Sequence, residues 1–65
     1  MLVTEAQWRA KRLADNLRFA IRGLENVIDK GAERLTTVEL GRLESARVAC
    51  VALEKKLLQF AGVIP

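Results

Sequence analysis

The sequence contains no histidine and no tyrosine, and its single cysteine is Cys50. Without histidine the commonest general base and zinc ligand is missing, and one cysteine cannot form a disulfide within the chain. The acidic side chains alternate with basic ones and lack the Glu-x-x-His spacing of a di-metal carboxylate site. These absences predict a protein that is not an enzyme and that has no catalytic residue, metal site or cofactor.

Long apolar segments are also missing. The longest apolar run, Val48–Leu53, is far shorter than the ~20 residues needed to cross a bilayer. The first residues, Met1–Glu5, lack the basic-then-apolar layout of a secretory signal. We therefore expect a cytoplasmic protein with no membrane contact. In that setting Cys50 is predicted to pack as a small hydrophobic residue; a redox thiol or a disulfide across a dimer axis is the alternative.

The chain is short for a protein with so few means of reinforcement. It has 65 residues, of which 51% are hydrophobic and 29% charged, a balance typical of a folded helical protein. A domain of this size hides only ~60% of the surface that its unfolded chain exposes, so its stability is marginal without a disulfide, a metal or a partner chain. Since the first two are excluded, the composition favours a partner chain.

Two helix starts carry the same signature. Thr4–Gln7 and Thr36–Glu39 both have the pattern of a capping box, in which a threonine hydroxyl accepts a backbone N–H and the side chain three residues later reaches back. Gly31 is predicted to end the first helix in a left-handed conformation, and Gly62 to cap the second. The prediction is a single all-α domain over residues 1–65, an antiparallel hairpin with a helix at 4–30, a loop at 31–36 and a helix at 37–61.

Within both helices the apolar residues recur in alternating steps of three and four, the heptad pattern of a coiled coil. The first helix has a and d positions at Val3, Ala6, Ala10, Leu13, Leu17, Ala20, Leu24 and Val27, flanked at e positions by Ala14, Ile21 and Ile28. The second helix has Leu43, Ala46, Cys50, Leu53, Leu57 and Phe60.

The run Val48–Leu53 is apolar on every side of its helix, and one neighbouring helix covers only one stripe of it. Two hairpins side by side cover more, so we expect a homodimer that forms a four-helix bundle. Its core and dimer contacts are predicted at Leu13, Leu17, Ile21, Leu24, Ile28, Leu43, Cys50, Val51, Leu53 and Leu57. The layout resembles the homodimeric four-helix bundles of the Rop family, with which no sequence motif is shared.

The net charge of +3 lies entirely in residues 1–22. There, Trp8 and Phe19 fall on one side of the first helix, away from the heptad positions, together with Arg12 and Arg22. Such a patch is typical of a surface that binds another protein, and it can also stack bases and contact phosphates. The alternative is a structural role, with Trp8 packed over Val3 and Phe19 capping the neighbouring hairpin.

The sequence alone does not specify a biochemical activity, but it favours one class of function. We expect a small interaction protein, acting as an adaptor, inhibitor or assembly factor, that binds itself and another protein. One alternative is a nucleic-acid-binding regulator that uses the basic first helix, and a further one is a structural oligomerisation segment.

Overall fold

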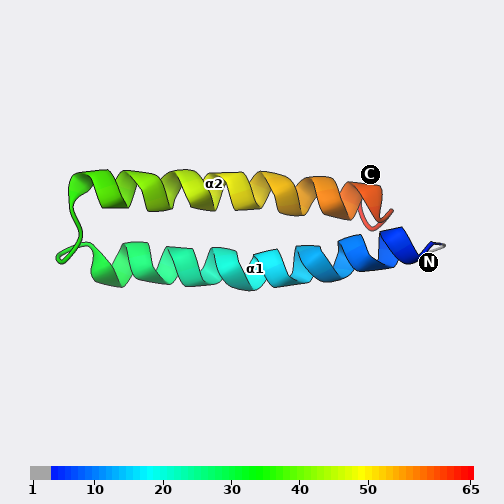
Figure 1. Cartoon of the computed structure of the whole chain (residues 1–65), viewed down its shortest axis with the longest axis horizontal. Coiled ribbons are helices and arrows are strands. Elements are labelled where there is room, and N and C mark those ends of the chain that lie inside the picture. Colours follow the sequence, from blue (N-terminus) through cyan, green and yellow to red (C-terminus); the bar gives the residue numbers. More distant parts are fainter. Residues whose placement is uncertain (1–3) are drawn as a thin grey trace.

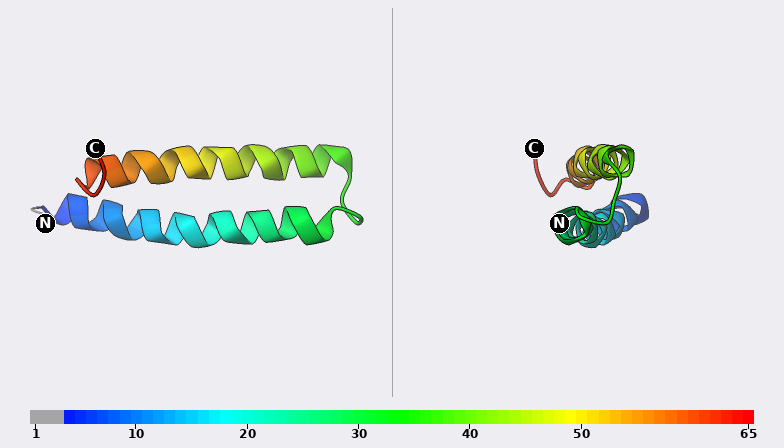
Figure 2. Two further views of the ribbon diagram at one scale, coloured as in Figure 1. Left: turned by 180° about the vertical axis from the view of Figure 1, so that it is seen from behind. Right: turned by 90° about the vertical axis from the view of Figure 1, so that its left-hand side faces the viewer.

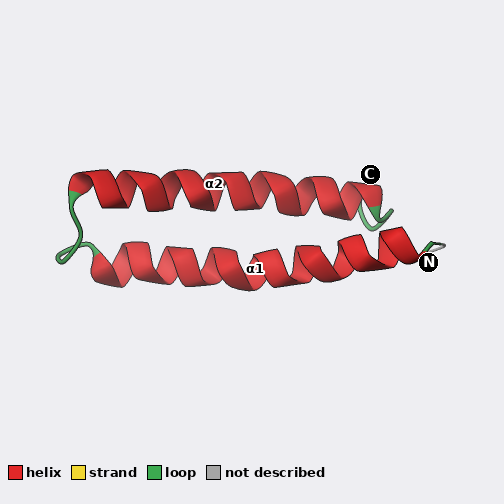
Figure 3. Cartoon of the chain, viewed as in Figure 1, coloured by secondary structure: helices red, strands yellow, loops and turns green. Residues whose placement is uncertain are grey.

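The computed structural model describes residues 4–65, which form two antiparallel helices joined by a short loop (Figures 1 and 3). Helix α1 spans Glu5–Gly31 and helix α2 spans Thr37–Phe60. The two lie side by side along their full lengths, with both termini at one end and the loop at the other. The predicted all-α hairpin is therefore confirmed. Val3, predicted to pack under Trp8, lies outside the described residues.

Thr4 begins α1 as predicted, but only half of the predicted capping box forms. The backbone N–H of Gln7 donates to Thr4 Oγ1 at 3.0 Å, which satisfies one of the free amides at the helix start. The Gln7 side chain reaches back to the hydroxyl of Thr4 and not to its backbone, since Thr4 Oγ1 donates to Gln7 Oε1 at 3.2 Å. Its Nε2 donates to the carbonyl oxygen of Phe60 at 3.2 Å, so this glutamine joins the start of α1 to the end of α2.

The predicted capping box of α2 is complete. Glu39 N–H donates to Thr36 Oγ1 at 3.1 Å, and Thr36 N–H donates to Glu39 Oε1 at 2.9 Å. The bond from the Thr36 backbone holds the pKa of Glu39 below its usual range, with a smaller contribution from the Thr36 hydroxyl. The charged carboxylate therefore stabilises this helix start.

The left-handed glycine is at the end of α2 and not at the end of α1. Gly62 has a φ of 78° and directly follows Ala61, whereas Gly31 keeps a negative φ as the last residue of α1. The prediction for Gly62 is confirmed and the prediction for Gly31 is wrong. The chain leaves α1 through a tight turn closed by Arg34 N–H and the Gly31 carbonyl at 2.9 Å, for which right-handed geometry suffices.

The hairpin is a thin rod (Figure 2), and few of its side chains are buried. It measures 46 × 15 × 14 Å, and its radius of gyration of 14.4 Å exceeds the ~11 Å of a compact domain of this length. In the described part of the chain the buried hydrophobic residues are Ala10, Ala14, Ile21 and Ala61. Three of these are alanines, so little of the available apolar surface is covered within the chain.

Candidate functional site

The side of α1 that faces α2 is rotated from the predicted one. The better covered apolar side chains occupy the a and e positions, and they are Ala10, Ala14, Leu17, Ile21, Leu24 and Ile28. The d positions are exposed at Ala6, Leu13, Ala20 and Val27. The e residues, predicted as a flank, therefore form half of the contact within the chain, and the d residues do not.

Helix α2 shows the same rotation. Its half-buried residues are Leu40, Leu43, Arg47, Cys50, Glu54, Leu57 and Leu58, and Ala61, which directly follows the helix, is fully buried. The predicted d residues Ala46, Leu53 and Phe60 are exposed. Two charged side chains, Arg47 and Glu54, thus lie at positions that a well-packed helix pair fills with apolar residues. Sequence reasoning missed them because their charge is typical of a solvated helix face.

Ion pairs join or line the two helices along one edge of the hairpin. Arg18 Nε donates to Glu54 Oε2 at 3.1 Å, and Glu54 retains only 15% side-chain exposure. Arg47 donates to the carboxylate of Glu44, which lowers the pKa of Glu44 and raises that of Arg47, with a smaller effect of Glu25 on Arg47. We call these residues the ion-paired edge. Its charges are paired within the hairpin.

The opposite edge carries the exposed d residues of both helices. In an antiparallel pair, equivalent heptad positions of the two helices lie on the same side of the pair. Arg18 is at a b position and forms an ion pair with Glu54 at an e position, so the b positions of both helices lie at the ion-paired edge. The d residues, on the other flank of each seam, therefore form one surface. We call it the open face, and it consists of Ala6, Leu13, Ala20, Val27, Ala46, Leu53 and Phe60.

The larger side chains of the open face are strongly exposed. The exposed fraction is 55% for Leu13, 48% for Val27, 53% for Leu53 and 58% for Phe60. Of the residues predicted as core or dimer contacts, Leu13 and Leu53 are on this face, whereas Leu17, Ile21, Leu24, Ile28, Leu43, Cys50 and Leu57 are between the helices. Val51 is exposed on the side of the ion-paired edge.

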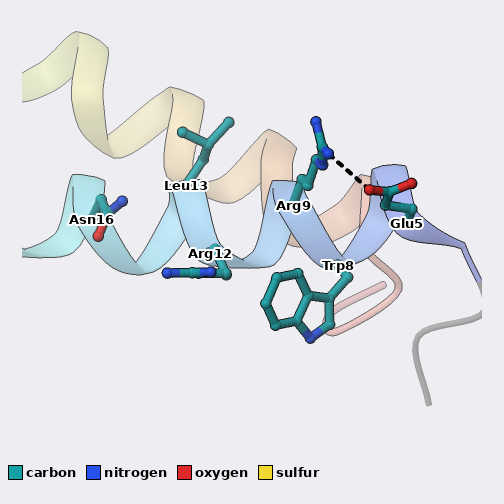
Figure 4. A pocket seen from close by; sticks show the side chains of 6 residues that line it. All are labelled: Glu5, Trp8, Arg9, Arg12, Leu13 and Asn16. Atoms are coloured by element: carbon teal, nitrogen blue, oxygen red, sulfur yellow. Dashed lines mark hydrogen bonds and ion pairs between the residues drawn. The ribbon is translucent and has the colours of Figure 1, made fainter.

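A second apolar feature is the side of α1 that faces away from α2. We call it the outer surface of α1, formed by Trp8, Arg12, Phe19 and Arg22, all of them exposed. Arg12 lies over the Trp8 ring, with its guanidinium carbon 5.0 Å from the ring centroid, a cation–π contact. Figure 4 shows both side chains projecting from the same side of α1 beside a shallow recess, while Glu5 and Arg9 form an ion pair across its rim.

The structure brings together only part of the predicted aromatic and basic patch. Trp8 and Arg12 share the recess, but Phe19 and Arg22 do not line it. Eleven residues of helix separate Trp8 from Phe19 by ~16 Å along the axis, so one small ligand cannot contact both rings. The patch therefore suits an extended partner.

Residues 4–65 contain no cluster of three side chains able to hold a metal ion, and neither α1 nor α2 is long and apolar enough to cross a membrane. Cys50 is a free, half-buried thiol on the inner side of α2. Among known protein families, curated proteins and solved structures, no significant match to this chain was found. The geometry of the two exposed apolar surfaces is therefore the basis for a functional proposal.

Proposed function

We propose that this chain is a small, non-enzymatic interaction protein that dimerises through its open face into an antiparallel four-helix bundle and binds another protein through the outer surface of α1. The observation that carries the proposal is the position of the exposed d residues, which both helices present on the same side of the hairpin.

The heptad positions fit such a bundle. Each helix in a four-helix bundle contacts two neighbours, so it needs an apolar stripe about three positions wide. In this chain the e residues face the other helix of the hairpin and the a residues lie at the centre. The d residues are left to face a second hairpin. In a single hairpin the d residues stay exposed to solvent, whereas the charges of the ion-paired edge on the other side are paired with each other.

The chain exposes more surface than a compact monomer of its mass, and the excess is similar to the area that one partner buries in a dimer interface. The chain exposes 5165 Å², whereas a compact monomer of 7.2 kDa exposes about 4100 Å². The excess is close to the ~800 Å² that each partner loses in a standard interface. A second copy on the open face therefore accounts for the unusual surface of this rod.

The outer surface of α1 supports the second part of the proposal. It faces away from α2, and although the recess beside Trp8 and Arg12 borders Leu13 of the open face, Phe19 and Arg22 lie outside that recess. Tryptophan and arginine are the residues that most often dominate binding energy in protein interfaces, and Trp8 and Arg12 already contact each other. A two-fold dimer presents this surface twice, which favours a symmetric or extended partner.

Nucleic acid binding is the less favoured alternative. Arg9, Lys11 and Arg18 form ion pairs with Glu5, Asp15 and Glu54, so half of the six basic residues of α1 are already partly neutralised within the chain. If phosphates were bound, the affinity for mixed RNA or DNA would fall steeply with added salt. A structural oligomerisation segment would instead form assemblies larger than a dimer.

Sedimentation equilibrium at micromolar concentration tests the proposal with a matched pair of variants. Leu53 and Val48 lie on the same helix and are both 53% exposed, but only Leu53 belongs to the open face. We expect the wild type and Val48→Lys to sediment as dimers and Leu53→Lys as a monomer. A monomeric wild type that still melts cooperatively, or equal effects of the two lysines, would contradict the proposal.

A further inference from the structure

The open face is bordered by basic side chains. The g positions beside its d residues hold Arg9 and Lys30 on α1 and Arg42 and Lys56 on α2, and we call these four residues the basic rim. The only acidic residue at a d or g position of the described helices is Glu39. Four positive charges and one negative charge leave +3 on this side, which equals the net charge of the whole chain.

In the described part of the chain, one of the four residues of the basic rim has an ion-pair partner, unlike the residues of the ion-paired edge. Arg9 forms an ion pair with Glu5, in which both side chains are more than 70% exposed. In the part of the chain that the structure describes, Lys30, Arg42 and Lys56 form no ion pair. The charges beside the open face are therefore largely uncompensated within one hairpin.

The antiparallel arrangement places basic residues at both ends of the open face. The bond from Gln7 to Phe60 brings the start of α1 to the end of α2, so Arg9 and Lys56 belong to the end that carries the termini. Lys30 and Arg42 belong to the loop end, next to the turn from Gly31. The apolar part of the face lies between these two basic ends.

We propose that self-association of this chain is coupled to the uptake of small anions from solution, which bind where the basic rims of the two copies meet. This inference rests on the dimer proposed above. In an antiparallel bundle either end of one hairpin lies beside an end of the other, and both ends are basic. Glu39 offsets one positive charge at the loop end, but both ends keep an excess of positive charge in either orientation of the second copy, so association concentrates positive potential and draws in anions.

Added salt is expected to strengthen this self-association, whereas it weakens the binding of nucleic acids. Added chloride screens and neutralises the rim, so the dimer tightens as salt rises, whereas a protein that binds phosphates releases counterions and weakens. By linkage, an anion that favours the dimer also binds more tightly to the dimer than to the monomer. The open face thereby acts as an association surface whose strength depends on the anion concentration.

Sedimentation equilibrium of the full chain in NaCl between about 0.02 and 0.5 M tests this inference, since that range shortens the screening length several-fold. We expect the dimer dissociation constant of the wild type to fall about ten-fold over the range. Salt also strengthens apolar association in general, so variants are needed to isolate the rim.

The double variant Arg42→Gln, Lys56→Gln removes two rim charges, and Lys55→Gln, Arg22→Gln removes two exposed charges elsewhere. Lys55 and Lys56 are neighbours in sequence, but Lys55 is at an f position that points away from the open face. We expect the rim variant to dimerise more tightly at low salt and to lose most of the salt dependence, while the control variant retains it.

Two outcomes would overturn the inference while leaving the dimer intact. One is a wild-type dissociation constant that is constant or rises with NaCl, and the other is equal salt dependence in the rim and control variants. A wild type that is monomeric at every NaCl concentration would instead overturn the proposed dimer, and this inference with it.

Discussion

Replacing Leu13 with alanine should weaken the dimer by an amount that can be calculated from the exposed fraction of the Leu13 side chain. Leu13 is 55% exposed in the hairpin, and full burial of a leucine side chain contributes about 1.5–3 kcal/mol. Covering the exposed half therefore contributes about 1 kcal/mol per chain, and about 2 kcal/mol per dimer because two-fold symmetry repeats the contact. At about 1.4 kcal/mol for each ten-fold change, the dissociation constant of Leu13→Ala should rise about thirty-fold.

Val48→Ala is the matched control for this experiment, because Val48 has a similar exposed fraction, 53%, and lies outside the open face. Dissociation constants from sedimentation equilibrium, with far-ultraviolet circular dichroism to verify helicity, should place this variant within about two-fold of the wild type. The assignment of Leu13 to the interface would be refuted if both substitutions changed the dissociation constant equally.

Two further predictions concern the helix start of α2 and the outer surface of α1. Because the folded-state pKa of Glu39 is lowered, its stabilisation is fully present above the unfolded pKa of about 4.3 and is lost as pH falls through the folded pKa. In thermal melts the wild type should exceed Glu39→Gln in melting temperature from pH 7 to about 5, and a difference that persists unchanged at pH 3 would contradict this. Replacing both Trp8 and Phe19 with alanine should leave helicity and dimer mass unchanged, since both side chains are exposed away from α2; unfolding of this double variant would place the pair in the core.

The sequence predicted the hairpin well because helix starts and periodicity are local properties. The threonines at 4 and 36 each cap a helix, and the predicted helices at 4–30 and 37–61 differ from Glu5–Gly31 and Thr37–Phe60 by one residue at most at each end. The wrong prediction at Gly31 has a simple cause. Glycine permits a left-handed conformation without requiring it, and the local turn decides whether it is used.

Periodicity could not decide which part of a wide apolar stripe faces the other helix. Between Ala10 and Ile28 the a, d and e positions of α1 are all apolar, so a rotation by one position leaves the pattern equally satisfied there. The ion pair between Arg18 and Glu54 forms with the e positions inward, and it depends on residues 36 positions apart. The open face is visible only once that tertiary contact is known.

The aromatic and basic patch was predicted from helical spacing, which gives the side of the helix that each residue occupies but not the contacts between their side chains. Spacing places Trp8 and Phe19 on nearly the same side of α1, and both are exposed. It does not tell whether two such side chains contact a common point. The structure instead shows a cation–π contact of Trp8 with Arg12, four residues away.

The uneven packing between the helices has a consequence for the order in which the hairpin forms. Near the loop the inner residues of α1 are large, as at Leu24 and Ile28, whereas near the termini they are Ala10 and Ala14. The segments that meet near the loop are also close in sequence, while Gln7 and Phe60 are 53 residues apart. Bringing together two residues that are close in sequence costs less chain entropy, so contacts between the helices should form first near the loop and then progress towards the termini. The terminal end would then be the last part to form and the first to open.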